Sequence, residues 1–166
     1  RRTTTLNAYV SGFAGSRRVV LYDTLVRDVP RDEALSVVAH ELAHAGHDDV
    51  LVGTVLGASG AAAAVGLLAL VLGRRRADDP ATVPTLVALL AVGSLLALPV
   101  QNGISRTIEL RADVEALRVT EDPEAFVDLQ RRLALRSLAD PTPPAWSHWW
   151  FGSHPTLLVR VALARS

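Results

Sequence analysis

The residues best suited to carry out chemistry lie in the run Ala39-His40-Glu41-Leu42-Ala43-His44. Two histidines four positions apart share one face of a helix, about 6 Å apart, and can offer two nitrogen ligands to one zinc ion. Glu41 would then hold its carboxylate beside the metal, where it can act as a base on a water molecule. The same pattern also arises by chance in amphipathic helices, so further ligands must be found elsewhere in the chain.

The composition restricts what else could hold a metal. The 166 residues include no cysteine, which excludes disulfides and thiolate ligands and leaves histidines and carboxylates. Basic and acidic residues balance to a formal net charge of zero, so no nucleic-acid partner is expected. The length suits a single domain with a core of its own.

Two long uncharged runs, residues 50–73 and 81–100, divide the chain. Each is long enough to cross a hydrocarbon core as a helix, which takes about 20 residues. We interpret them as a membrane hairpin whose outer ends emerge on the same side, and the alternative is a pair of buried helices in a soluble protein. We expect one domain over residues 1–166 with three parts, at 1–49, 50–100 and 101–166.

Shorter elements are expected on both sides of the hairpin. Residues 6–10 and 18–22 are typical of strands, and Gly12 and Gly15 between them favour a turn. Such a β-hairpin can be purely structural, or it can offer an edge that binds an extended peptide. Helices are expected over residues 23–28 with Asp23 as N-cap, from Asp32 as N-cap through the histidines, over 101–120, over about 124–138, and in a last segment through Arg160.

Two of these features bear on the membrane. If the helix from Asp32 continues unbroken into residues 50–73, His40 and His44 would lie about two turns above the membrane surface. The three tryptophans, Trp146, Trp149 and Trp150, suit either a membrane-interface belt or an apolar groove.

A third metal ligand is expected after the membrane hairpin. Catalytic zinc sites use three protein ligands and leave one position open for water. Glu109 is the candidate, and Asp113 lies one helical turn further, where a carboxylate can accept the second ring N–H of a ligating histidine. Taken alone, these carboxylates also fit a solvated surface with ion pairs to Arg106 and Arg111.

Four sequence blocks, in this order along the chain, resemble the M48 metallopeptidases, which include the Ste24 CAAX prenyl proteases and the HtpX heat-shock proteases. The blocks are Asn7-Ala8-Tyr9 followed by Arg18-Val19-Val20-Leu21-Tyr22-Asp23, His40-Glu41-x-x-His44, Ser105-Arg106-x-x-Glu109-x-x-Ala112-Asp113, and Ser153-His154-Pro155 followed by Arg160. The first and last blocks are closer to the Ste24 branch. The resemblance implies a mainly α, integral-membrane fold with a zincin-like (gluzincin) core, a small β-hairpin, and a transmembrane hairpin inserted between the metal-binding helices.

The resemblance also implies a role for each candidate site residue. One Zn²⁺ per chain would be held by His40, His44 and Glu109, and Asp113 would support a ligand histidine. Glu41 would be the general base, and His154 would steady the oxyanion. The strand Asn7-Ala8-Tyr9 would lie along the substrate backbone.

These roles describe a zinc-dependent endopeptidase acting near the surface of the lipid bilayer on a peptide or a membrane protein. CAAX-type processing and membrane-protein quality control are both compatible with them. The alternatives are a non-catalytic membrane adaptor or sensor with the same fold, and an inactive fragment. The sequence specifies no oligomeric state.

The resemblance implies an integral protein of a bacterial plasma membrane with its active site facing the cytoplasm. The arginines at 74–76 in the hairpin loop favour the opposite orientation by the positive-inside rule. Because the chain opens Arg1-Arg2 without Met, we expect a piece of a longer protein that lacks the membrane helices preceding this region in Ste24 proteases.

Overall fold

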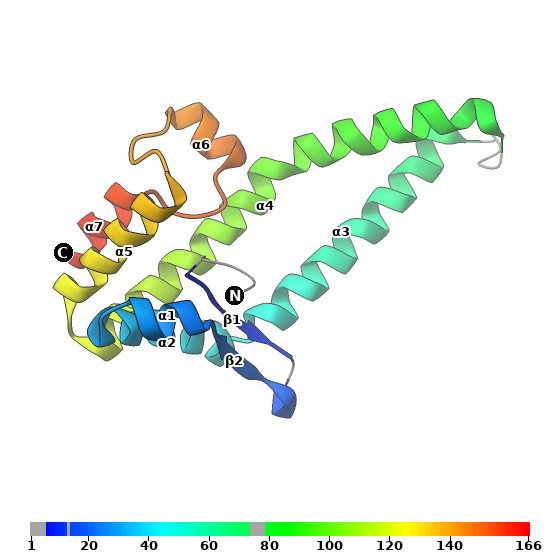
Figure 1. The fold of residues 1–166 in the computed structure, drawn as a ribbon. Coiled ribbons are helices and arrows are strands. Elements are labelled where there is room, and N and C mark those ends of the chain that lie inside the picture. The colour runs from blue at the N-terminus through cyan, green and yellow to red at the C-terminus, as the bar shows by residue number, and fades with distance from the viewer. Residues whose placement is uncertain (1–5, 13, 74–78) are drawn as a thin grey trace.

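The structure is a computed structural model that describes residues 6–12, 14–73 and 79–166. One helix and the first half of another extend together away from a body formed by the rest of the chain (Figure 1). The elements in chain order are β1 (Ala8–Ser11), the 3-10 turn η1 (Ala14–Ser16), β2 (Arg18–Leu21), α1 (Asp23–Asp28), α2 (Arg31–Gly46), α3 (Asp49–Leu72), the 3-10 turn η2 (Pro80–Thr82), α4 (Val83–Thr120), α5 (Pro123–Ser137), α6 (Ala145–Phe151) and α7 (Leu157–Ala164).

The two strands form the predicted β-hairpin. They pair antiparallel, with Ala8 opposite Leu21 and Ser11 opposite Arg18, and β1 begins two residues later than predicted. Gly12 has a φ of +86°, and a Cβ there would lie 2.5 Å from the carbonyl oxygen of Ser16. Only glycine therefore fits this position of the turn.

Helices α1 and α2 lie where the sequence predicted them, but their predicted N-caps are wrong. The N-cap residues are Tyr22 and Pro30, and neither makes a side-chain cap hydrogen bond. Asp23 and Asp32 instead lie in the first turn of each helix. Their carboxylates there interact favourably with the helix dipole rather than with a single N–H group.

The histidine helix does not continue into the first apolar run, so the expectation of one unbroken helix is wrong. Helix α2 ends at Gly46, Asp48 adopts a left-handed conformation with φ 55° and ψ 33°, and α3 begins at Asp49. A left-handed residue ends a helix and redirects the chain. The turn brings Asp49 back towards the last turn of α2.

Helices α3 and α4 are long and apolar, and their surfaces are exposed. Both pass the length and hydropathy test for a membrane span, and none of the residues in their apolar windows is buried. Within the described part of the chain they are therefore not covered by other elements, and their exposed leucines and valines suit a lipid environment. The arginines at 74–76 in the predicted hairpin loop lie outside the described residues.

A single helix carries both the second apolar run and the predicted ligand segment. Helix α4 has 38 residues, with Pro99 inside it, and it changes direction along its length (Figure 1). All of the predicted segment 101–120, and the segment 81–100 from Val83 onwards, are therefore parts of one continuous helix. This continuity fixes Glu109 and Asp113 at a set distance from the apolar half of the helix.

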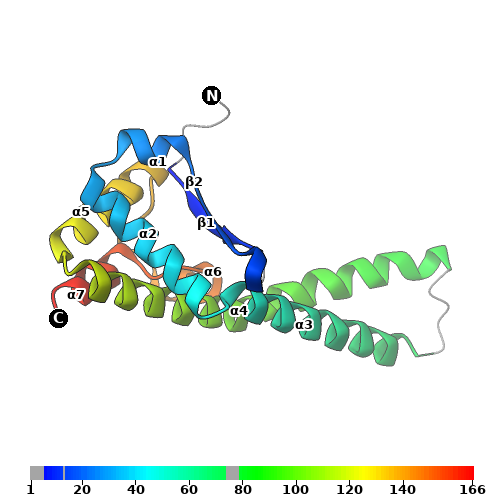
Figure 2. The same cartoon turned by 90° about the horizontal axis from the view of Figure 1, so that it is seen from below.

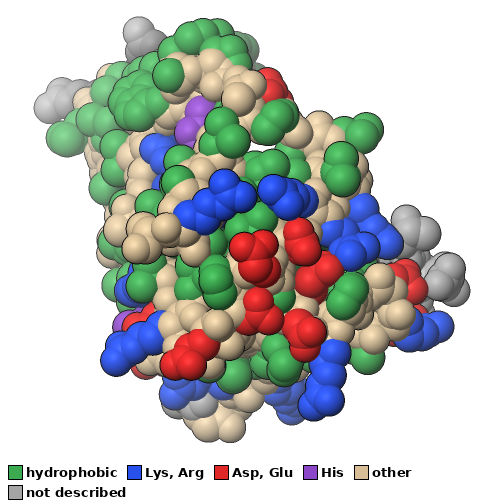
Figure 3. All heavy atoms as spheres, turned by 90° about the vertical axis from the view of Figure 1, so that its left-hand side faces the viewer, with side chains coloured by type: hydrophobic (Ala, Val, Ile, Leu, Met, Phe, Trp, Pro, Cys, Tyr) green, Lys and Arg blue, Asp and Glu red, His purple; other side chains and the backbone are tan. Residues whose placement is uncertain are grey.

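The body packs around α2, which crosses α4 and lies against α5 (Figure 2). Arg132 on α5 donates through Nε and Nη2 to the two carboxylate oxygens of Glu33 on α2, at 2.7 and 2.8 Å. Helix α5 starts at the predicted place, with Asp122 accepting from the Ala125 N–H at 3.0 Å. The face opposite the helical pair carries charged side chains of both signs (Figure 3), in contrast to α3, which has no charged residue after Asp49 at its start.

Candidate active site

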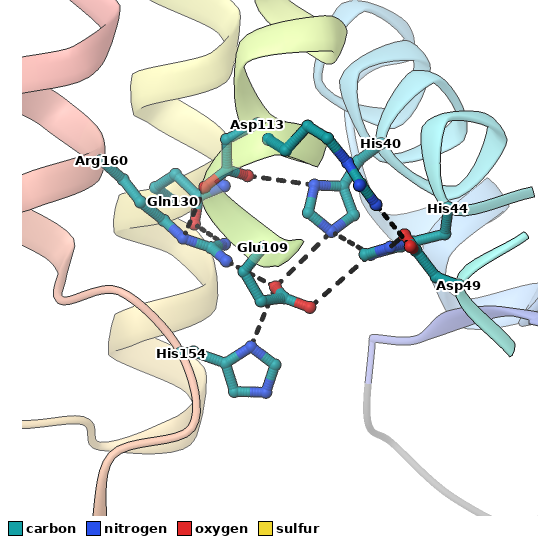
Figure 4. A network of polar contacts seen from close by, with 9 residues as sticks. His40, His44, Asp49, Glu109, Asp113, Gln130, His154 and Arg160 are labelled. Carbon is teal, nitrogen blue, oxygen red and sulfur yellow. Dashed lines mark hydrogen bonds and ion pairs between the residues drawn. The ribbon is translucent and has the colours of Figure 1, made fainter. Parts of the chain in front are cut away.

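The structure brings together His40 and His44 of α2 with Glu109 of α4 (Figure 4). The two histidine Nε2 atoms lie 3.0 Å apart. Glu109 Oε2 lies 3.6 Å from His40 Nε2, and Glu109 Oε1 lies 3.6 Å from His44 Nε2. One ligand atom from each of these side chains falls within 4.8 Å of the others, so the three can hold one metal ion.

Each histidine turns its other ring nitrogen to a carboxylate. His40 Nδ1 lies 3.0 Å from Asp113 Oδ1, and Asp113 is completely buried. His44 Nδ1 lies 2.9 Å from Asp49 Oδ2, and Arg111 donates to the other oxygen of Asp49. In a neutral imidazole, a carboxylate close to Nδ1 favours the proton on that nitrogen and leaves the electron pair of Nε2 for a metal.

This tautomer would fit a bound cation. Two unprotonated Nε2 atoms 3.0 Å apart, next to a carboxylate, present three electron pairs to one point and would repel one another. A tetrahedral zinc ion with Zn–N bonds of about 2.0–2.1 Å places two ligand nitrogens roughly 3.3 Å apart. The donor set and its spacing therefore suit zinc.

The two oxygens of Glu109 have different surroundings. Oε2 accepts from Arg160 Nη2 and lies next to His154 Nδ1, each at 2.9 Å. Oε1 faces His44 and has neither of these partners. Glu109 is thus arranged to offer Oε1 to a metal while Oε2 is held by α7 and the segment before it.

Arg160, like Arg106, is an arginine of the family-like blocks to which the sequence assigned no role in the site. Besides Glu109 it contacts Asp113, with Nε 3.0 Å from Oδ2, and it donates through Nη1 to Gln130 Oε1 at 2.9 Å. One guanidinium therefore joins the third candidate ligand to the carboxylate that orients His40. Its membership in the fourth sequence block was the only signal, because its contacts lie more than 25 positions away along the chain.

Asp49 is a second site residue that the sequence analysis missed. It became a partner of His44 only because the chain reverses at Asp48. Two adjacent aspartates directly before an apolar run indicate a helix start, and that signal could have placed a break there.

Glu41 lies in the wall of a cavity of about 210 Å³ that His40, Glu109 and His154 also line. Burial raises the pKa of its carboxyl group, and His40 and His44 act in the opposite direction. A carboxylate with a raised pKa is a stronger base near neutral pH. Glu41 therefore lies where a proton acceptor beside the metal would be needed.

The substrate strand predicted from the resemblance lies at the same cavity. The Asn7 carbonyl accepts from the Tyr22 N–H at 3.0 Å, so alternation along β1 turns the backbone of Tyr9 towards β2 as well. Ala8 and Val10 then direct their N–H and C=O groups to the other edge, and the Val10 backbone hydrogen-bonds to Glu41. Asn7 and Ala8 line the cavity, whereas Tyr9 lies outside its lining and packs edge-on against the Tyr22 ring.

His154 belongs to the segment between α6 and α7 and reaches the site from the side opposite α2. Its side chain is 64% exposed. Its hydrogen bond with Glu109 raises the pKa of the imidazole, against the effect of its partial burial. The predicted site residue is thus near the metal ligands, with one ring nitrogen on Glu109 Oε2.

Comparison with known proteins places this geometry in a family. The profile of peptidase family M48 matches residues 1–166. The chain is 30% identical over 171 residues to the uncharacterized metalloprotease YhfN of Bacillus subtilis, covering 96% of this chain and 40% of that protein. It is 29% identical over 186 residues to the protease HtpX homolog of Desulforapulum autotrophicum, covering 97% and 60%.

A solved structure shares the fold. The crystal structure of S. mikatae Ste24p superposes with a TM-score of 0.81 at 23% sequence identity, covering 97% of this chain and 42% of that one. The chain thus spans 40% to 60% of the length of these relatives. With a family profile that matches its whole length, the chain belongs to peptidase family M48.

Proposed function

We propose that this protein is a zinc-dependent membrane endopeptidase that hydrolyses peptide bonds near the bilayer surface. The observation that carries the proposal is that Glu41, the His40–His44–Glu109 group and the edge of β1 that faces away from β2 meet at one cavity. A base, a metal site and a strand edge in one place are the parts that metal-assisted peptide hydrolysis requires. A membrane adaptor would need none of them to meet.

His40, His44 and Glu109 would hold the metal, and Asp49 and Asp113 would keep the histidines in the tautomer that binds it. Bound zinc would acidify a water molecule and polarise the scissile carbonyl. Glu41 would accept the proton of that water on its carboxylate and pass it to the nitrogen of the leaving amine. His154 would donate a hydrogen bond to the oxygen that gains charge, with Glu109 keeping its imidazole in place.

The substrate would bind as an extended strand. The Ala8 N–H and C=O face away from β2 and towards the cavity, so a peptide can pair with them as a third strand of the sheet. Main-chain pairing of this kind aligns a scissile bond without depending on its side chains. Unfolded segments of membrane proteins and lipid-modified C-termini both meet this requirement.

The geometry of α4 supports cleavage close to the membrane. Glu109 lies nine residues beyond Val100, the last residue of the uncharged run, which is about 14 Å along a helix. With the outer ends of both spans on one side, the site lies on that side. We assign it to the cytoplasmic face of a bacterial plasma membrane, as the resemblance implies.

Glu41→Gln tests this proposal. The variant removes the base while keeping the shape of the side chain and the three metal ligands. In the complete natural chain in detergent, zinc content should stay near one per chain, and cleavage of an unfolded reporter protein should be lost. Glu124→Gln, at an exposed glutamate in the first turn of α5, is the matched control and should cleave normally.

Two results would contradict the proposal. Full cleavage by Glu41→Gln would remove Glu41 from the mechanism. A natural chain that binds zinc but cleaves no more than Glu41→Gln, over a panel of unfolded and lipid-modified substrates, would favour the adaptor.

A further inference from the structure

A tryptophan side chain replaces a hydrogen bond that Pro99 removes from α4. Proline has no N–H, so the carbonyl of Leu95, four residues earlier, has no donor within the helix. Trp150 Nε1 donates to this carbonyl at 3.2 Å. Leu95 belongs to the uncharged run of α4, so Trp150 contacts the chain within the segment long enough to cross a membrane.

Two further side chains of α4 hold the end of α6 against the same region. Asn102 Nδ2 donates to the Trp150 carbonyl at 2.5 Å. Arg106 Nη1 donates to the Gly152 carbonyl and lies 3.4 Å from the His148 carbonyl oxygen. Helix α6 is therefore fixed at the level of residues 95–106 of α4.

The remaining aromatic side chains of α6 are exposed. Trp146 is 70% exposed, Trp149 55% and Phe151 56%. The helix contains no Asp, Glu, Lys or Arg. Large aromatic side chains concentrated on one short, uncharged helix are costly to leave in water, so this surface needs an occupant.

The position of α6 along α4 identifies that occupant. Leu95 lies five residues inside the end of the uncharged run at Val100, which corresponds to about 8 Å along the helix. Leu96 and Val100 on α4 are exposed as well, so the apolar surface of the span continues to the level of α6. Tryptophan is enriched at this depth, where its ring packs against acyl chains and its N–H reaches polar groups.

We propose that α6 lies in the interfacial layer of the bilayer, with Trp146, Trp149 and Phe151 in contact with lipid. The helix then forms a third membrane contact besides α3 and α4, one that lies in the surface instead of crossing it. His154 follows α6 by three residues, so this contact also fixes the height at which His154 approaches Glu109. The inference depends on the membrane placement of α3 and α4 and not on the proposed hydrolysis.

The three tryptophans of the 166 residues all lie in α6, so tryptophan fluorescence, excited where tyrosine does not absorb, reports on this helix alone. In a longer form of the chain, tryptophans outside α6 would be replaced by Phe. The protein is reconstituted in vesicles of phosphatidylcholine and phosphatidylglycerol in which part of the lipid carries bromine, either near the headgroup end of the acyl chain or near its methyl end. Sedimentation after alkaline carbonate extraction reports separately whether α3 and α4 are inserted.

The expected result is a loss of fluorescence of about two-fold or more with bromine near the headgroup end, and a smaller loss with bromine near the methyl end. In single-tryptophan variants that replace the other two with Phe, Trp146 and Trp149 should each show this order. Because α6 carries no formal charge at neutral pH, the loss should not depend on the fraction of anionic lipid.

Three outcomes would overturn the proposal. Sedimenting protein whose tryptophans are quenched by aqueous iodide and not by bromine would place α6 in water. Protection from both quenchers would place a protein surface over α6, whether from more of the same chain or from another copy. Protein that is extracted by carbonate would remove the membrane placement of all three helices, whatever its peptidase activity.

Discussion

Arg160 donates to the oxygen of Glu109 that does not face His44. Its Nη2 lies 2.9 Å from Glu109 Oε2, and its Nε lies 3.0 Å from Asp113 Oδ2. The guanidinium thereby offsets the charge of two carboxylates that would otherwise repel each other beside the metal site. Glu109 Oε1, which faces His44, is not one of the oxygens that Arg160 contacts.

Replacing Arg160 by Lys should therefore weaken metal binding without removing a ligand. A lysine keeps the charge but cannot contact Glu109, Asp113 and Gln130 together through a planar group. We expect zinc affinity to fall by about 10- to 100-fold, the usual cost of losing a group that orients a ligand. Competition with a chromophoric chelator measures it.

Arg131→Lys is the matched control for that change. Arg131 is exposed on α5, and its ion pair within the described part of the chain is with Asp128 of the same helix. Its replacement should leave zinc affinity unchanged. An equal loss in both variants would point to a general loss of structure and not to the contacts of Arg160.

The two carboxylates behind the histidines should contribute unequally. Asp113 is completely buried between His40 and Arg160, whereas the side chain of Asp49 is 10% exposed and also pairs with Arg111. Replacing Asp113 by Asn leaves the charge of Arg160 without its carboxylate partner in a more buried place than replacing Asp49 leaves that of Arg111. Asp113→Asn should lower zinc affinity more than Asp49→Asn. If both variants bind zinc as tightly as the natural chain, the two carboxylates do not hold the histidines in the metal-binding tautomer.

Removing the metal should destabilise the body of the protein. Without a cation, the two Nε2 atoms 3.0 Å apart and Glu109 lose the charge that balances them. A ligand at about 100 times its Kd stabilises a fold by about 2.7 kcal/mol, so zinc should raise the melting temperature and EDTA should lower it. His44→Ala should show no zinc-dependent shift, and a shift of natural size in that variant would place the metal elsewhere.

The features that the sequence predicted are those set by local spacing. His40 and His44 share a face because four residues make about one helical turn, and Glu109 and Asp113 follow the same rule. The two uncharged runs predicted two helices long and apolar enough to span a membrane, because length and composition alone decide this property. Glu109 became a candidate because a catalytic zinc site needs a third protein ligand and Asp113 lies one turn beyond it, and the order of the family motifs then joined it to the histidines.

The features that the sequence did not predict depend on single backbone departures and distant contacts. Asp49 reaches His44 only because Asp48 adopts a left-handed conformation. A positive φ is uncommon for residues other than glycine, so the sequence did not predict this turn. Helix α6 was not predicted because its seven residues follow a proline-rich loop and show no long periodicity. Its place beside Leu95 depends on the Leu95 carbonyl, which accepts from Trp150 because Pro99 has no N–H to donate. The effect of Pro99 can be recognised only when residues 95 and 99 are known to lie in one helix.

The ion pair that joins α2 to α5 should stabilise the protein asymmetrically. Glu33 is buried, while the side chain of Arg132 remains 36% exposed. Arg132→Ala therefore strands a buried carboxylate, whereas Glu33→Ala leaves a guanidinium that water can reach. Thermal unfolding should show a larger loss of stability for Arg132→Ala than for Glu33→Ala, and almost none for Arg131→Ala.

Because His40 lies two helical turns from Glu33, about 10 Å, the zinc affinity of the folded variants should stay close to that of the natural chain. A larger loss for Glu33→Ala would mean that Glu33 supports α2 through packing more than through its charge.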